Sequence, residues 1–267
     1  MIGMEKKNNI PVVLVVGGLD PGGGAGLVAD VQTLAQHGCH AATVMTANTV
    51  QDTRSVKSFR PESAQLVREQ LEVVFSDLHP TVVKTGMLVN ADIVDALIDV
   101  LQNHPETKLI IDPVLSSNMD DSLSEHSLTN ALRERLLPLA ALVTPNIPEL
   151  AALTGEQGDA VASASKLDKC DSLVTGTHRE SEEVINRYYK KGRFYREWSW
   201  PRLAHEYHGS GCTLASAIAA GIAKGQDLVT SIDTAQRYVF SSLQSAFCPG
   251  SGQHIPSRIQ LDEKIDD

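Results

Sequence analysis

The chain has 267 residues, enough for one large α/β domain or two small ones with a sizeable core. Its net charge of −10 and isoelectric point near 5.3 argue against nucleic acid or an anionic membrane as a partner, although amide groups or a bound cation can still hold a phosphate. No apolar run reaches the ~18 residues that span a bilayer. The first nine residues lack the apolar stretch of a signal peptide, and the four cysteines form no C-x-x-C pair. We therefore expect a cytoplasmic protein with reduced thiols.

Short apolar runs alternate along the chain with segments of helical periodicity. This alternation implies right-handed crossovers and a mainly parallel sheet. The predicted buried strands are 12–16, 42–45, 81–84, 109–111 and 141–143. The predicted helices include 67–78, 93–101 and about 228–247, while 184–200 predicts a hairpin at the sheet edge. We expect an N-terminal tail over 1–11, a single domain over 12–248 and a loose polar tail over 249–267.

Polar and glycine-rich residues follow several of these strands, at the edge where open α/β sheets bind their ligands. The loop 17–26 is rich in glycine but matches neither the dinucleotide-binding nor the P-loop pattern. Asp112 and Asn146 each follow a strand, and Glu149 lies one helical turn after Asn146. Asp112 and Asn146 could instead serve a turn and a helix cap. Together, however, the three residues offer the oxygen ligands that Mg²⁺ prefers.

A second glycine turn, 208–213, opens an amphipathic helix. The amides of Gly209, Ser210 and Gly211, together with the helix start, predict an anion site. Cys212 lies within the turn, where a thiolate is favoured, so we expect this thiol to be more acidic than the others. The alternative is an ordinary N-terminal turn with Cys212 as a small buried hydrophobe. An anion site that faces ligands for a hard cation points to nucleotide phosphates and phosphoryl transfer.

Seven motifs, in this order, resemble those of the hydroxymethylpyrimidine/phosphomethylpyrimidine kinases of thiamine biosynthesis, in the ribokinase superfamily. The resemblance covers about Val12 to Phe247. The motifs are Asp20-Pro-Gly-Gly-Gly-Ala-Gly, Thr46-Ala47 with Gln51-Asp52-Thr53-Arg54, Lys84-Thr85-Gly86-Met87-Leu88, Asp112-Pro113-Val114, Leu136-Leu137-Pro138-Leu139-Ala140, Thr144-Pro145-Asn146-x-x-Glu149, and His208-Gly209-Ser210-Gly211-Cys212-Thr213-Leu214.

The resemblance implies a ribokinase-like three-layer α/β/α sandwich, with a mainly parallel central sheet and an antiparallel edge hairpin. It also implies two successive phosphorylations of 4-amino-5-hydroxymethyl-2-methylpyrimidine by ATP with Mg²⁺, and a homodimer. The residues carried over are Gly18, Asp30, Gln51 and Met87 for the pyrimidine, Asp112, Asn146, Thr175 and Gly176 for the nucleotide and its phosphates, Glu149, Asn146 (directly or through water) and Asp112 for Mg²⁺, Gly209, Ser210 and Gly211 for the phosphoryl group, and Cys212 where the wider superfamily has a catalytic Asp.

The chain departs from this family at two places that bear on phosphate binding. Thr175 stands where the family usually has Lys, so a positive charge is missing. The loop 115–121 is more acidic than the family's usual Lys- and Gly-containing loop. A pyridoxal kinase, or a pyrimidine-binding sensor without turnover, therefore stays open as an alternative.

Overall fold

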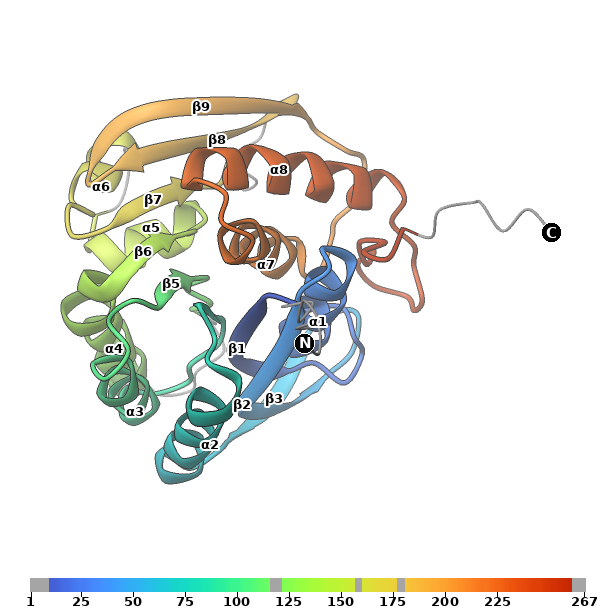
Figure 1. Cartoon of the computed structure of the whole chain (residues 1–267). Coiled ribbons are helices and arrows are strands. Elements are labelled where there is room, and N and C mark those ends of the chain that lie inside the picture. The colour runs from blue at the N-terminus through green and yellow to red at the C-terminus, as the bar shows by residue number, and fades with distance from the viewer. Residues whose placement is uncertain (1–9, 116–121, 157–159, 177–180, 261–267) are drawn as a thin grey trace, which may run out of the picture.

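The computed structural model describes residues 10–115, 122–156, 160–176 and 181–260 (Figure 1). The described strands form one sheet of nine, in the order β3-β2-β1-β4-β5-β6-β7-β8-β9. β1, β2 and β4 to β7 are parallel, whereas β3, β8 and β9 run antiparallel to their neighbours. The strands are β1 Val12–Leu19, β2 His40–Gln51, β3 Val56–Pro61, β4 Val82–Thr85, β5 Lys108–Ile111, β6 Ala140–Val143, β7 Asp171–Val174, β8 Glu183–Lys190 and β9 Arg193–Pro201.

Helices cover both faces of this sheet, so the domain has three layers (Figure 1). The helices are α1 Gly26–Gln36, α2 Ala64–Leu78, α3 Ala91–Leu101, α4 Ser122–Ala131, α5 Ile147–Thr154, α6 Ala160–Ser165, α7 Ser210–Ala223 and α8 Leu228–Gln244, with a π-helical turn at Leu132–Leu136 and a 3-10 turn at Leu137–Leu139. Alternation along β1 divides the core. Leu14 and Val16 pack with α2 to α6, whereas Val13 and Val15 pack with α1, α7 and α8.

The predicted fold class is confirmed, and most predicted elements are present. All five predicted strands, the two early helices and the edge hairpin β8–β9 are observed. The sequence reading missed β3 and β7, and the last helix ends at Gln244, three residues before the predicted end at Phe247. β7 was not predicted because two of its four residues, Asp171 and Ser172, are polar and break the apolar pattern. No helix among the described residues is long and apolar enough to cross a membrane.

The expected loose tail is wrong for the described part of the C-terminal segment. Phe247 and Ile255 form an antiparallel bridge. Ile255 is buried, and Arg258 is only 2% exposed. Polar groups of this segment form hydrogen bonds to the rest of the domain. Composition alone does not show whether a polar group bonds to protein or to water.

The two-sided core leads to a stability prediction for α2. Leu71 is fully buried in the core, whereas Leu66 of the same helix is 38% exposed. We expect Leu71→Ala to lower the free energy of unfolding by about 2–5 kcal/mol, because it leaves a cavity. The control Leu66→Ala should cost less than about 1 kcal/mol. Equal losses in urea denaturation would contradict this arrangement of α2.

Candidate active site

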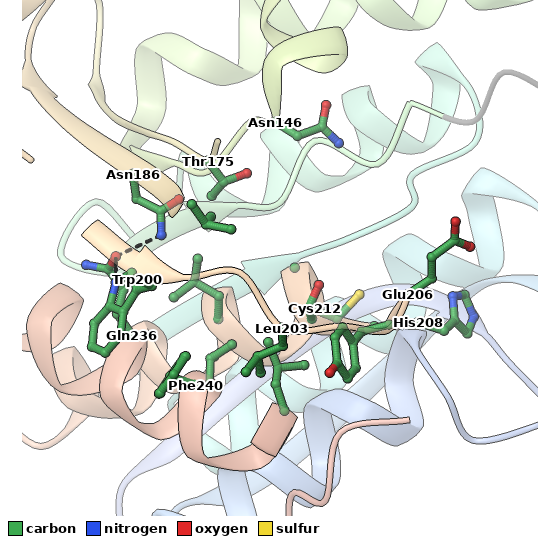
Figure 2. Close-up of a pocket in the computed structure, with 18 of the residues that line it drawn as sticks. Asn146, Thr175, Asn186, Trp200, Leu203, Glu206, His208, Cys212, Gln236 and Phe240 are labelled. Atoms are coloured by element: carbon green, nitrogen blue, oxygen red, sulfur yellow. Dashed lines mark hydrogen bonds between the residues drawn. The ribbon is translucent and has the colours of Figure 1, made fainter. Parts of the chain in front are cut away.

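A cavity of about 710 Å³ lies at the carboxyl ends of the parallel strands. Eight of the predicted site residues line it: Asp112, Asn146, Glu149, Thr175, Gly209, Ser210, Gly211 and Cys212. Figure 2 shows Asn146 and Thr175 on one side of this cavity and Cys212 on the other, with Trp200 and Phe240 at the left of the view. Residues from β5, β6, β7 and α7 thus meet at one place, as the sequence predicted for a sheet-edge site.

The turn before α7 has the geometry of an anion site. Gly209 is the N-cap residue, with a φ of +83° and no side-chain cap bond. A β-carbon at Gly209 would lie 2.0 Å from the carbonyl oxygen of Gly24, so only glycine fits here. The first amides of a helix have no acceptor within that helix, so those of Ser210, Gly211 and Cys212 are available to a ligand.

Below this turn lies a buried ion network that the sequence analysis did not identify. Lys84 Nζ is 2.8 Å from Asp30 Oδ1 and 3.6 Å from Asp112 Oδ2, and the Lys84 side chain is fully buried. Burial lowers the pKa of Lys84, but Asp30, Cys212 and Asp112 outweigh burial and raise this pKa above its usual range. Lys84 therefore stays charged. A lysine directly after two valines in a short, fully buried strand was the available signal.

Asp30 belongs to this network and does not line the cavity. Its Oδ1 accepts hydrogen bonds from Lys84 Nζ at 2.8 Å and from Ser216 Oγ at 2.7 Å, and the residue is 1% exposed. These bonds give Asp30 a structural role, and its contact with a pyrimidine edge stays a prediction. Its carboxylate fixes Lys84 and the first turns of α7.

The other three residues predicted for the pyrimidine form a neighbouring group, also outside the 710 Å³ cavity. A β-carbon at Gly18 would lie 3.3 Å from Met87 Sδ, so these two residues are adjacent. Gln51 Nε2 donates to Thr49 Oγ1 at 2.7 Å, and Thr49 Oγ1 donates to the Leu19 carbonyl at 2.8 Å. β1 is the neighbour of both β2 and β4, which brings these residues to the same edge as the cavity.

Asn146 and Glu149 are joined in a capping box. Asn146 Oδ1 accepts from Glu149 N, and Glu149 Oε2 accepts from Asn146 N, both at 2.9 Å. The cap considered as an alternative for Asn146 is therefore present. It uses one oxygen of Glu149 and places that carboxylate on the cavity wall.

Two carboxylates facing one cavity fit a divalent cation. Asp112 Oδ2 is buried and has no hydrogen-bond partner among the described residues. Burial raises the pKa of Asp112 despite the nearby Lys84. Burial, and then the charge of Asp112, raises the pKa of Glu149 to about 8. No group of three or more His, Cys, Asp or Glu among the described residues could hold a metal alone. Mg²⁺ commonly binds through one or two carboxylates and substrate phosphates, which matches this pair.

Thr175 and Gly176 have separate positions. Thr175 lines the cavity, and its N–H donates to the Pro145 carbonyl at 2.9 Å. Gly176 is buried against β8, where a β-carbon would lie 2.2 Å from the Ile185 carbonyl oxygen, and its N–H donates to Asn186 Oδ1. Gly176 therefore packs the sheet and does not line the cavity. Most of the acidic loop 115–121 lies outside the described residues.

Comparisons with known proteins identify the family of this chain. The family model of phosphomethylpyrimidine kinase matches residues 20–257, which is most of the chain. This chain belongs to the phosphomethylpyrimidine kinase family. A hydroxymethylpyrimidine/phosphomethylpyrimidine kinase of Streptomyces coelicolor is 36% identical over 91% of this chain and 92% of that protein. A bifunctional thiamine biosynthetic enzyme of Arabidopsis thaliana is 37% identical over 94% of this chain. The chain spans about half the length of such bifunctional relatives, 50% in that case.

Solved structures support the ribokinase-like fold. A pyridoxal kinase from Staphylococcus aureus in complex with ADP superposes with a TM-score of 0.85 at 25% identity, over 94% of each chain. A phosphomethylpyrimidine kinase from Clostridium difficile superposes with a TM-score of 0.72 at 28% identity, over 87% of this chain and 99% of that one. The predicted family and the kinase class that goes with it are confirmed.

The expected acidic thiol at Cys212 is wrong for this member of the family. Burial raises the pKa of Cys212 to about 12, although Lys84 opposes the shift. Asp112 and Asp30 raise it further, so the thiol stays protonated at neutral pH. The helix start alone predicted a lowered pKa for this thiol. Burial and the nearby carboxylates of Asp112 and Asp30, which sequence spacing does not reveal, raise the pKa instead.

The raised pKa of Glu149 predicts a pH effect on stability. Between pH 4.5, its ordinary value, and about pH 8, the folded protein keeps a proton that the unfolded chain has released. The free energy of unfolding without Mg²⁺ should therefore fall as pH rises through this window. Glu149→Gln keeps the capping box and removes the ionisation. Urea titrations should show a shallower pH dependence for this variant, and identical slopes would contradict the buried position.

The four thiols should differ in alkylation rate. Cys248 is exposed, Cys212 is half-buried, and Cys39 and Cys170 are buried. We expect iodoacetamide at pH 7.5 to label Cys248 first and Cys212 slowly, because a protonated thiol is a poor nucleophile. Peptide mass spectrometry over time measures the order. Labelling of Cys212 ahead of Cys248 would show that its thiol is ionised after all.

Proposed function

We propose that this chain transfers the γ-phosphoryl group of ATP to the hydroxymethyl oxygen of 4-amino-5-hydroxymethyl-2-methylpyrimidine, and then phosphorylates the monophosphate. One observation carries this proposal. The free amides at the start of α7 line one cavity together with Asp112 and Glu149, in a member of a kinase family. Amides bind the charge of a transferring phosphoryl group, and carboxylates hold the cation that balances it.

In this proposal each side chain has a limited task. Asp112 and Glu149 would hold Mg²⁺, which would balance the negative charge of the nucleotide phosphates. Lys84 holds Asp112 from behind. Cys212, as a neutral thiol beside the acceptor hydroxyl, orients that hydroxyl. Because the transition state of phosphoryl transfer is loose, little base strength is required of it.

The substrates would occupy neighbouring parts of the sheet edge. The nucleotide would occupy the 710 Å³ cavity, whose wall includes Trp200 and Phe240 with ring centroids 5.2 Å apart. The pyrimidine would lie beside Gly18, Gln51 and Met87. A cytoplasmic location and a homodimer, both expected from the resemblance and the sequence, belong to the same proposal.

Pyridoxal phosphorylation is the second candidate. It is favoured by the close superposition of the Staphylococcus aureus pyridoxal kinase, at a TM-score of 0.85. The family names and the match over residues 20–257 favour the pyrimidine instead.

One assay separates the candidates. The full chain is mixed with MgATP and with hydroxymethylpyrimidine, its monophosphate or pyridoxal, and ADP and products are measured by mass spectrometry. The proposal requires product from both pyrimidines at rates above those with pyridoxal. Binding of the pyrimidine without ADP would establish a sensor, and faster turnover of pyridoxal would establish a pyridoxal kinase.

Thr175→Lys tests phosphate recognition at the cavity. A lysine here would add charge beside Asn146 and so favour the more anionic acceptor. We expect kcat/KM for the monophosphate to rise about 10-fold, corresponding to about 1.4 kcal/mol, with less change for the alcohol. Thr175→Met is the matched control for size. The same change with both acceptors would show that position 175 does not distinguish them.

A further inference from the structure

Arg258 is a buried cation in the C-terminal segment, far along the chain from the site. It is 2% exposed and is the largest of the fully buried side chains. Its guanidinium donates in three directions. Nε donates to Thr213 Oγ1 at 2.8 Å, and one terminal nitrogen donates to the Gly24 carbonyl. The other donates to Gln32 Oε1 at 3.3 Å and to the Gly23 carbonyl at 3.4 Å.

Three of these acceptors belong to the two glycine segments that border the site, and the fourth, Gln32, is in α1. Gly23 and Gly24 lie in the loop between β1 and α1, and Thr213 is in the first turn of α7. Thr213 Oγ1 also donates to the Gly209 carbonyl at 2.7 Å, so the guanidinium is linked through one hydroxyl to the N-cap of α7. A β-carbon at Gly209 would lie 2.6 Å from the guanidinium, which is therefore directly behind the anion turn.

The contacts of Arg258 are all with neutral acceptors. Among the residues that the structure describes, no carboxylate forms an ion pair with it. A guanidinium cannot lose its proton in a protein, so the charge persists inside the domain. Burial lowers the pKa of Arg258, and the carboxylates of Asp30 and Asp20 oppose that shift through space without a direct contact. A further anion nearby would stabilise this buried charge. The amides of the anion turn are the neighbouring place where such an anion would bind.

The backbone on both sides of this cation is fastened to the domain. The Tyr238 hydroxyl donates to the Arg258 carbonyl at 2.6 Å, and the Ser257 N–H donates to the Ser242 carbonyl at 2.9 Å. On the other side of the glycine loop, Asp20 accepts from the N–H groups of Gly22 at 2.8 Å and Ala25 at 2.9 Å. The guanidinium is thus the bridge between two parts that are each held in place.

We propose that Arg258 is a positioning residue for phosphoryl transfer: it holds the loop Gly22–Gly26 against the anion turn Gly209–Cys212, and its unpaired charge strengthens that turn for an anion. The inference rests on the proposed kinase function for its catalytic readout, but not for the geometry. Arg258 does not line the cavity. It therefore acts only through Thr213, the loop Gly22–Gly26 and the anion turn Gly209–Cys212.

Two variants separate positioning from folding. Arg258→Met keeps the length and apolar stem but removes charge and donors, and we expect kcat to fall about 10²-fold, as for a misplaced or weakened oxyanion donor. Arg258→Lys keeps the charge but cannot donate in three directions, and we expect a fall of about 10-fold. KM for the pyrimidine should change less than 3-fold in both, since Arg258 forms no hydrogen bond to Gln51 or Met87 of the proposed subsite.

Gln260→Ala is the matched control in the same segment. Its side-chain Nε2 donates a hydrogen bond to Ser241 Oγ at 3.0 Å, in α8 and not in either glycine segment. This variant should keep wild-type kcat. Melting temperatures of all variants are measured beside the kinetics. If Arg258→Lys melts near the wild-type temperature and keeps kcat within 2-fold, or if Arg258→Met loses only stability, the proposal is wrong.

A binding experiment keeps this inference separate from the proposed function. Titration calorimetry with MgADP is carried out on wild type, Arg258→Lys and Arg258→Met, without any acceptor. We expect affinity to fall about 10-fold in Arg258→Met. If the wild type binds MgADP but phosphorylates none of the acceptors, and the variant still binds more weakly, the proposed function fails and Arg258 keeps its role. Unchanged MgADP affinity together with unchanged kcat would overturn that role.

Discussion

The arrangement of the site depends on one buried cation, Lys84, held between two buried carboxylates. Charges inside a protein must be paired, because removing one partner leaves the other uncompensated at a cost of several kcal/mol. Asp30 comes from α1, Lys84 from β4 and Asp112 from the end of β5, and Ser216 of α7 bonds to Asp30. The ion network therefore connects α1, β4 and the end of β5 to α7, the helix that begins with the anion turn. A shift of α7 would separate Ser216 from Asp30, so the position of the turn is coupled to the ion pair.

The same network sets the protonation of the groups above it. Asp112 shares Lys84 with Asp30, so one cation faces two carboxylates, and Glu149 adds a third acidic group across the cavity. This excess of negative charge favours a divalent cation at the cavity. Burial, and then the charge of Asp112, raises the pKa of Glu149. Burial, reinforced by Asp112 and Asp30, also raises the pKa of Cys212 and keeps its thiol protonated. A neutral thiol is sufficient for a reaction in which placement and charge stabilisation do most of the catalysis.

Positive charge reaches the anion turn from within the domain rather than from its surface. Lys84 lies beneath Cys212, and Arg258 lies behind Gly209. Thr175, on the cavity wall, supplies no positive charge, although the family that the sequence resembles usually has a lysine at this position. Buried cations act in a lower effective dielectric than exposed ones, so their fields at the turn are screened less by salt. Under the proposed function, their placement would allow a chain with a net charge of −10 to hold a phosphate.

The sequence by itself determined the parallel sheet, the edge hairpin and the sheet-edge positions of Asp112, Asn146, Glu149 and the 209–212 turn. These follow from local periodicity, from glycine, and from the rule that parallel strands end at one edge. Only the tertiary structure decided that Asp30 pairs with Lys84, that the Cys212 thiol is neutral and that Arg258 is buried. Each of these depends on groups brought together from distant segments, such as Asp30 and Lys84, whose residue numbers differ by 54. Burial and through-space charge, which decide protonation and pairing, are not encoded in spacing along the chain.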